Sequence, residues 1–287
     1  MDVPEIFDRR LRALRRDRAQ PGYAGHGFVR AAMIEAILDR LDLVTRPFGS
    51  ALDLGCADGT LTRALMARGT NVTACDAGAA FATAIGGVQC DEDRLPFASG
   101  SFDLIVSAGV LDTVNDLPGA LVQCRRALRP DGLFLGAFVG AGSLPRLRAA
   151  VSEADASSGG AVPARFHPGI DVRAAGDLLV RAGFVLTVAD GERLEVGYPD
   201  AFRLMADLRG MAATSQLAGQ RPPWLGRSRL ASLAQAFAGQ ADADGRVRER
   251  FELIFMTGWA PGPDQPRPAR RGSATASLAA ALRPPSE

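Results

Sequence analysis

A short glycine-bearing turn between an apolar strand and a helix constrains this chain more than any other feature. It lies in the segment ALDLGCADGT (51–60), where an apolar run is followed at once by the turn and a helix. Gly55 and Gly59 let the backbone pass close to a ligand, and the helix N-terminus behind them offers unpaired N–H groups. We therefore expect a nucleotide-binding corner formed by Gly55, Cys56, Ala57 and Gly59, with Cys56 contributing only loop contact.

Apolar strands and helices alternate after this corner. Strands are expected at 51–56, 71–76, 88–91, 102–108, 133–139, 184–189 and 250–259, and helices between them at 60–68, 117–128, 143–157 and 172–182. Such alternation is typical of a parallel sheet with helices on both faces. The predicted fold class is α/β, a Rossmann-like sheet of seven strands.

Segments outside this series define the expected domain organisation. Residues 1–45 hold two N-terminal helices, at 4–18 and 28–43, and a nucleotide-binding domain covers 46–260. Within it, residues 190–248 separate the last two strands and contain a short strand and two helices, so we expect an inserted helical lobe that acts as a lid or partner surface. The tail at 261–287 is rich in Pro and Arg and is expected to be extended or poorly ordered.

Composition excludes several classes of function. The hydrophobic fraction of 47% and charged fraction of 23% are typical of a globular protein, and no apolar run is long enough to cross a membrane. A net charge of +1 gives no general case for nucleic acid as a partner. The chain contains no lysine, which excludes Schiff-base chemistry. With no secretory signal in the first twenty residues, we expect a cytoplasmic protein of a bacterium, with peripheral attachment to the inner membrane as an alternative.

The corner does not match the motifs for dinucleotides or triphosphates. A dinucleotide motif needs glycine where this chain has Ala57 and Thr60, and a P-loop needs a lysine. A small nucleoside remains as the candidate ligand of the corner. Acidic residues lie within or at the ends of the first three strands, namely Asp53, Asp76 and Asp91.

Ligands of open α/β sheets bind outside the carboxyl ends of the strands. Asp76 can therefore accept hydrogen bonds from ribose hydroxyls and Asp91 from an adenine amino group, while Asp53 holds N–H groups of the loop. Two such carboxylates also suit a positively charged sulfonium. The alternatives are structural: Asp76 as the cap of the next helix, and Asp91 as a strand end.

Five segments together resemble the class I S-adenosylmethionine (SAM) methyltransferase superfamily. They are ALDLGCADG (51–59), VTACD (72–76), DEDRLPF (91–97), SFDLIVS (101–107) and LRPDG (128–132). The resemblance implies SAM as cofactor, a seventh strand inserted antiparallel between the fifth and sixth, and Glu92 and Ser107 as further members of the site. The family usually has glycine at the position of Ala57.

A closer resemblance extends over nearly the whole chain. It rests on IFDRRLRALRRDRA (6–19), VNDLPGAL (114–121), YPDAFRLMADLRGM (198–211), FELIFMTGWA (251–260) and RPARRGSA (267–274). These segments resemble mitochondrial complex I assembly factor 5 and its bacterial relatives, which neighbour the malonyl-carrier-protein methyltransferases of biotin synthesis.

The resemblances leave three functions open, of which only the second rests on the closer resemblance alone. The first is SAM-dependent methyl transfer to an unidentified acceptor, which needs little acid–base help because the sulfonium is already a good leaving group. The second is arginine hydroxylation of a respiratory complex I subunit, and the third is a non-catalytic, SAM-binding assembly chaperone. Partners would be SAM together with a complex I subunit or a carrier protein.

The remaining candidates for chemistry are few. His26 and His167 lie in unrelated loops, so no metal site is expected. Asp112 stands in a segment that often faces the substrate in relatives, commonly as a His-Trp or Gln-Trp pair; it is either a substrate contact or general base, or the start of the next helix. The arginines in 9–18 form either a solvated helix face or a docking site. No catalytic residue is assigned.

Overall fold

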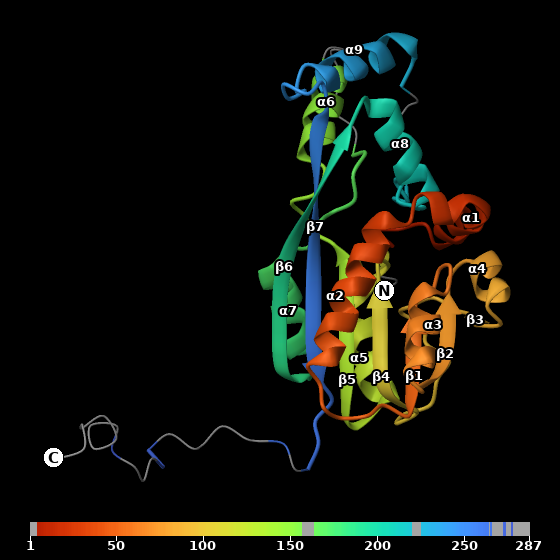
Figure 1. Cartoon of the computed structure of the whole chain (residues 1–287), viewed down its shortest axis with the longest axis vertical. Helices are drawn as coiled ribbons and strands as arrows, with labels where there is room; N and C mark the ends of the chain where they lie inside the picture. The colour runs from red at the N-terminus through yellow and green to blue at the C-terminus, as the bar shows by residue number, and fades with distance from the viewer. Residues whose placement is uncertain are drawn as a thin grey trace.

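A single seven-stranded sheet organises the chain. The computed structural model describes residues 5–156, 164–219 and 225–263, together with 265, 272, 273 and 277. The strand order in the sheet is β3-β2-β1-β4-β5-β7-β6 (Figure 1). The strands are β1 (Ser50–Leu54), β2 (Asn71–Asp76), β3 (Val88–Gln89), β4 (Phe102–Ala108), β5 (Leu128–Val139), β6 (Val185–Tyr198) and β7 (Val247–Trp259).

The direction of the strands confirms the predicted fold class. Strands β1 to β5 pair in parallel, whereas β7 pairs antiparallel with both β5 and β6. The last strand in the sequence therefore lies between the fifth and sixth strands, as the resemblance to SAM methyltransferases implied.

Helices cover both faces of the sheet. The helices are α1 (Arg9–Ala19), α2 (Phe28–Asp42), α3 (Thr60–Ala67), α4 (Ala79–Ala84), α5 (Leu117–Ala127), α6 (Pro145–Ala156), α7 (Val172–Arg181), α8 (Ala201–Gly210) and α9 (Arg227–Ala238), with short 3-10 turns at Gln20–Gly25 (η1) and Leu111–Thr113 (η2). Apolar residues of α2 and α3 form one buried cluster with the sheet, and those of α5 and α7 form another on the opposite face. Strands buried on both faces explain the continuous apolar runs of β1 and β4.

The last two strands are longer than predicted. The sequence indicated strands at 184–189 and 250–259, but β6 and β7 pair as far as Tyr198 and Val247. The short strand expected inside the insertion is the continuation of β6. Polar residues such as Glu192, Arg193 and Glu195 obscured it, because this part of the strand extends past the sheet and is largely exposed. The two long strands carry α8 and α9 away from the sheet, where α9 packs beside α6 (Figure 1).

Two further expectations concern the ends of the chain. The N-terminal helix begins at Arg9, later than the predicted residue 4, because Asp8 caps it by accepting a hydrogen bond from the Leu11 N–H at 2.9 Å. Most of the predicted extended tail at 261–287 lies outside the described residues. None of the helices in the described ranges is long and apolar enough to cross a membrane.

The sheet core gives the first testable prediction. Phe134 on β5 is fully buried, and its ring centroid lies 5.4 Å from that of Phe184. Replacing Phe134 with alanine should lower the free energy of unfolding by about 3–5 kcal/mol, because a large apolar contact is lost and a cavity is left. Urea denaturation of the two proteins measures the difference. Val180→Ala on the exposed side of α7 is the control and should change stability by less than about 0.5 kcal/mol.

Candidate functional site

The turn after β1 has a backbone shape that few side chains tolerate. Gly55 and Gly59 have φ values of +80° and +76°, and Ala57 between them has a φ of +45°. A Cβ on Gly55 would lie 2.5 Å from methyl groups of Val110, so only glycine fits there. The turn is therefore held between the strand end and the loop after β4, with its N–H groups placed at the carboxyl edge of the sheet.

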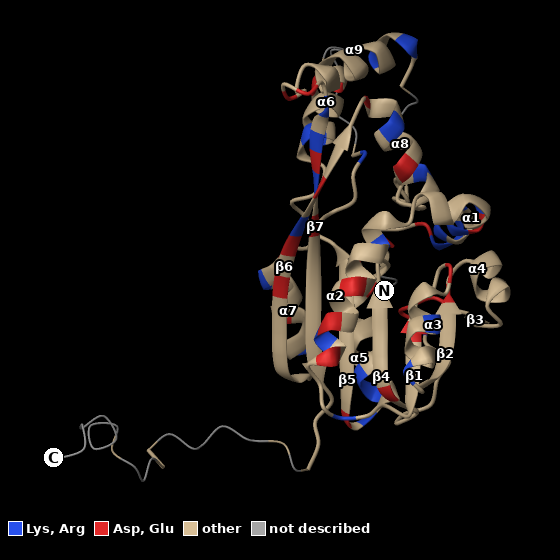
Figure 2. Cartoon of the chain, viewed as in Figure 1, with Lys and Arg blue, Asp and Glu red and all other residues tan. Residues whose placement is uncertain are grey.

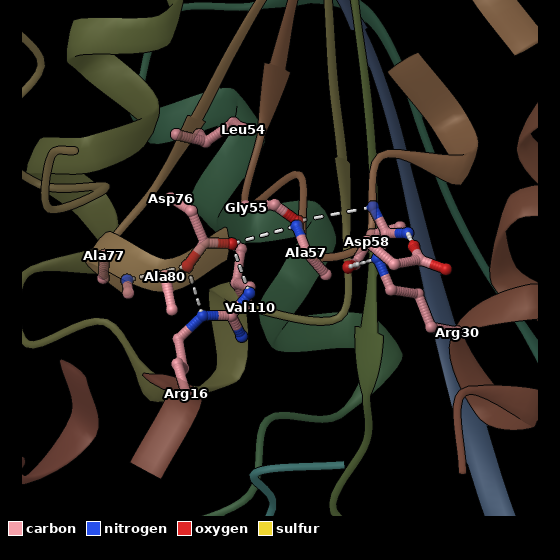
Figure 3. Close-up of polar contacts among 12 residues, drawn as sticks. Arg16, Arg30, Leu54, Gly55, Ala57, Asp58, Asp76, Ala77, Ala80 and Val110 are labelled. Atoms are coloured by element: carbon pink, nitrogen blue, oxygen red, sulfur yellow. Dashed lines mark hydrogen bonds and ion pairs between the residues drawn. The ribbon is translucent and has the colours of Figure 1, made fainter. Parts of the chain in front are cut away.

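Asp76, the last residue of β2, faces this turn. Its carboxylate accepts hydrogen bonds from the N–H of Ala57 at 3.0 Å and of Gly78 at 2.8 Å. Arg16 of α1 donates to both carboxylate oxygens, through Nε at 2.6 Å and through Nη2 (Figure 3). Burial alone would raise the pKa of Asp76, but Arg16 and the two N–H donors outweigh burial and hold the pKa below its ordinary value.

Two more arginines of α1 pair with the acidic segment after β3. Arg12 binds both oxygens of Glu92, at 2.5 and 2.9 Å, and Arg9 binds both oxygens of Asp93, at 2.5 and 2.8 Å. Asp91 lies 3.4 Å from Arg9 and remains partly exposed. Helix α1 thus sets arginines above strand ends that carry acidic residues (Figure 2).

We call Arg9, Arg12 and Arg16 the arginine clasp. The sequence suggested that the arginines of 9–18 form a solvated face or a docking site, and for Arg12 and Arg16 this is wrong: they are 4% and 7% exposed. Spacings of three and four residues place all three on one side of the helix. Arg10 and Arg18 are exposed, as the solvated interpretation predicted.

Other predicted site residues are buried inside the corner formed by β1 and the following turn. Asp53 is fully buried; one oxygen accepts from Thr62 Oγ1 at 2.6 Å, and the other lies 3.9 Å from Arg30 without a hydrogen-bond partner. Ser107 Oγ donates to the Leu54 carbonyl at 2.9 Å. Burial raises the pKa of the Cys56 thiol, which keeps it protonated and unreactive. Their assignment to cofactor binding stays a prediction.

Beside the clasp lies a cavity of about 400 Å³. Its walls come from α2, the loops after β4 and β5, the strand β7 and the lobe, and they are largely apolar. Apolar lining residues include Val29, Met33, Leu144, Phe166, Met205, Leu208, Met211 and Phe251. Charged lining residues are Arg12, Arg16, Arg30, Arg148, Arg165 and Asp112. The cavity therefore has apolar walls, five arginines and, among the described residues, one carboxylate.

Asp112 lines this cavity from the 3-10 turn η2 and does not lie at the start of α5. The cap of α5 is Asp116, which accepts from the Gly119 N–H at 2.9 Å, so the interpretation of Asp112 as the start of the next helix is wrong. Burial raises the pKa of Asp112 to about 6, although Arg12 and Arg16 oppose the shift. The side chain can therefore exchange a proton near neutral pH inside the cavity.

The two histidines have different hydrogen-bond partners. His167 Nε2 accepts from the Gln216 N–H at 2.8 Å, and burial together with Arg15 and Arg148 lowers its pKa to about 4. His26 Nδ1 lies 2.7 Å from Asp207 of α8. Within the described ranges, no three His, Cys, Asp or Glu residues are grouped in a way that could hold a metal ion.

Sequence reasoning missed Arg30, which donates to the carbonyls of Gly55 and Ala108 and to Asp58.

Comparison with known proteins identifies the family. Residues 52–136 match the methyltransferase domain family. The chain is 32% identical over 285 residues to the mitochondrial arginine-hydroxylase NDUFAF5 of Danio rerio, covering 96% of this chain and 88% of that protein. It is also 32% identical over 263 residues to a malonyl-[acyl-carrier protein] O-methyltransferase of Methylovorus sp. (strain MP688), covering 85% and 86%.

The chain belongs to the SAM-dependent methyltransferase superfamily, in the group of NDUFAF5. A solved structure of a putative methyltransferase from Bacillus halodurans has the same fold, with a TM-score of 0.53, 15% identity and coverage of 79% of this chain and 98% of that one. The family assignment supports SAM-dependent methyl transfer as the activity, and the methyltransferase fold implies the use of SAM.

The pKa of Asp112 leads to a prediction about stability. Because folding raises this pKa from 3.8 to about 6, the neutral carboxyl is favoured in the folded chain. Its contribution to stability is complete below about pH 4 and is lost as the pH rises through about 6. Asp112→Asn should therefore gain about 2–3 kcal/mol relative to the unmodified chain between pH 4 and pH 8.

Urea denaturation of both chains at a series of pH values measures this gain. Asp39→Asn, which changes an exposed carboxylate on α2, is the matched control and should show no such trend. A constant difference between Asp112→Asn and the unmodified chain across the pH range would contradict the prediction.

Proposed function

We propose that this protein transfers the methyl group of SAM to a carboxylate that enters the cavity. The observation that carries the proposal is Arg148, a cation in an apolar wall that has no carboxylate within 4 Å among the described residues. Its Nε donates to the Ser143 carbonyl at 3.0 Å, and its guanidinium carbon lies 4.5 Å from the centre of the Phe166 ring. Ring and carbonyl orient the guanidinium, and the buried carboxylate of Glu249 interacts with it electrostatically without an ion pair within 4 Å, so an anionic group of a substrate would be its direct partner.

The residues at the strand ends fit SAM by type. The turn from Gly55 to Gly59 would receive the amino-acid end, Asp76 the ribose hydroxyls, and Asp91 or Glu92 the adenine. Asp76 and Glu92 are at present paired with the arginine clasp, so binding in this way requires Arg16 to leave Asp76. When bound, SAM supplies a methyl group on a positively charged sulfur that leaves as a neutral thioether.

The residues of the cavity favour such a reaction with a carboxylate. An acceptor carboxylate is ionised at neutral pH and needs no base, which agrees with the few acid–base groups that line the cavity. As the new C–O bond forms and the C–S bond breaks, the negative charge of the acceptor and the positive charge of the sulfonium both disappear. Apolar walls favour a step in which opposite charges neutralise each other, because they solvate the separated charges poorly.

The relatives support a carboxylate acceptor and suggest an alternative. The malonyl-[acyl-carrier protein] O-methyltransferases are named for methylation of such a substrate, since a malonyl group ends in a free carboxylate. The alternative is arginine hydroxylation of a complex I subunit, which the similarity to NDUFAF5 favours. Four of the five lining arginines form ion pairs within the described residues, but Arg148 does not, and its charge would repel a substrate guanidinium; for this reason we favour the acidic acceptor.

Arg148 provides the test. With malonyl-[acyl-carrier protein] as probe and SAM carrying a labelled methyl group, the unmodified chain should produce labelled ester. Arg148→Ala should lower kcat/KM by about 10- to 100-fold, the value of one or two charge-assisted hydrogen bonds. Arg146→Ala, on the exposed side of the same helix, is the matched control and should keep the activity.

Mass spectrometry of candidate substrates separates the alternatives. A product heavier by one CH₂ group supports methyl transfer, whereas an arginine peptide heavier by one oxygen atom supports hydroxylation and would overturn the proposal. Equal activity of Arg148→Ala and Arg146→Ala would remove Arg148 from the site.

A further inference from the structure

We propose that helix α1 is a gate on the cofactor site, closed by the arginine clasp and opened when SAM replaces Arg16 on Asp76. The inference rests on the proposed function, since it takes Asp76 as the residue that receives the ribose. It adds a competition within the chain: the same carboxylate has an internal cationic partner and an external ligand, and the two cannot bind it together.

The hydrogen bonds of Asp76 require this competition. A carboxylate has about four acceptor positions, and here two are taken by backbone N–H groups of Ala57 and Gly78 and two by Arg16. The backbone donors belong to the turn and to the segment before α4, which remain in place. The ribose hydroxyls can donate hydrogen bonds to Asp76 only at the acceptor positions that Arg16 now occupies.

Helix α1 is held by polar contacts that a polar ligand can replace. Its buried residues are Arg12, Arg16 and Ala19, so only Ala19 contributes a buried apolar side chain, in a small cluster with Tyr23 and Phe81. The clasp fixes it mainly through ion pairs to Asp93, Glu92 and Asp76. Replacing a buried ion pair with another well-bonded partner costs far less than leaving a buried charge unpaired.

Helix α1 is joined to the lobe just before its first turn. Phe7 forms an antiparallel bridge with Leu217; the Asp8 N–H donates to the Gln216 carbonyl, and the Ala218 N–H to the Ile6 carbonyl, both at 2.8 Å. Segment 216–218 follows α8 and borders the cavity through Gln216. Movement of α1 is therefore transmitted to one wall of the acceptor cavity.

Release of Arg16 also changes the charge of the cavity. Arg16 already lines it, so withdrawal from Asp76 leaves a guanidinium there without its carboxylate. An anionic acceptor can neutralise that charge. The gate therefore links the two ligands: binding of SAM at Asp76 increases the affinity of the cavity for an acidic substrate.

Calorimetry with S-adenosylhomocysteine tests the gate on the full chain. Arg16→Ala removes the competitor and should lower the Kd by roughly tenfold or more, because the open state no longer has to be selected from a small population. Arg18→Ala removes an exposed arginine from the other side of α1 and should leave the Kd unchanged. Asp76→Asn should weaken binding in either background.

Hydrogen exchange of the unmodified chain gives a second measurement that does not depend on the folding of any variant. Most ligands slow exchange near their site, but here S-adenosylhomocysteine should speed exchange of the α1 amides, residues 9–19, while slowing exchange at 55–60.

The outcomes separate the two proposals. Binding that depends on Asp76, is not tightened by Arg16→Ala and slows exchange in α1 would overturn the gate and leave the proposed function standing. If neither the unmodified chain nor Arg16→Ala binds S-adenosylhomocysteine, both proposals fail. Tighter binding by Arg16→Ala together with faster exchange in α1 supports the gate.

Discussion

The buried ion pair between Arg16 and Asp76 links the parts of the molecule on which an activity depends. Asp76 ends β2 and accepts a hydrogen bond from Ala57 in the turn after β1, while Arg16 comes from α1 and lines the cavity. Each charge is expensive to bury alone and acceptable only while the other matches it. The shape of the turn, the position of α1 and the charge of the cavity therefore cannot change independently.

Arginine performs every cationic role in this chain, because lysine is absent. Arg30 shows the consequence: one planar guanidinium reaches the carbonyls of Gly55 and Ala108 and the carboxylate of Asp58, and so connects α2 to the turn and to the end of β4. A lysine would satisfy fewer of these acceptors from one position. The same property allows the clasp to bind three carboxylates through two oxygens each, which gives α1 a defined orientation with Ala19 as its one buried apolar side chain.

Much of the fold could be predicted from the sequence, and the clasp could not. The strands Asn71–Asp76 and Phe102–Ala108 were predicted with their observed bounds, because apolar runs between turn residues are a local signal. The position of Asp76 at a strand end followed from the same signal. The partner of Asp76 lies sixty residues away in the sequence, and a row of arginines at helical spacing looks the same whether it faces solvent or acids. The topology brings the ends of β2 and β3 under α1. Only this arrangement distinguishes arginines that face carboxylates from arginines that face solvent. The full length of β6 and β7 was missed for a related reason, since the buried face of their extension, which includes Tyr198, Val247 and Phe251, packs against helices of the lobe, a tertiary contact that no local pattern shows.

Thermodynamic linkage makes the effect of SAM and of the acceptor on each other's affinity reciprocal. The contacts between the lobe and α1 connect the two binding sites. If SAM at Asp76 increases the affinity of the cavity for an anion, an anion in the cavity must increase the affinity for SAM by the same factor. Physically, an acidic acceptor that attracts Arg16 weakens its hold on Asp76 and opens the position that the ribose requires. The hydrogen bonds between the Ile6–Asp8 segment and residues 216–218 place the wall of the acceptor cavity on the same moving unit. A chain built in this way favours the state with both ligands over either state with one, because the charge released by one ligand is neutralised by the other.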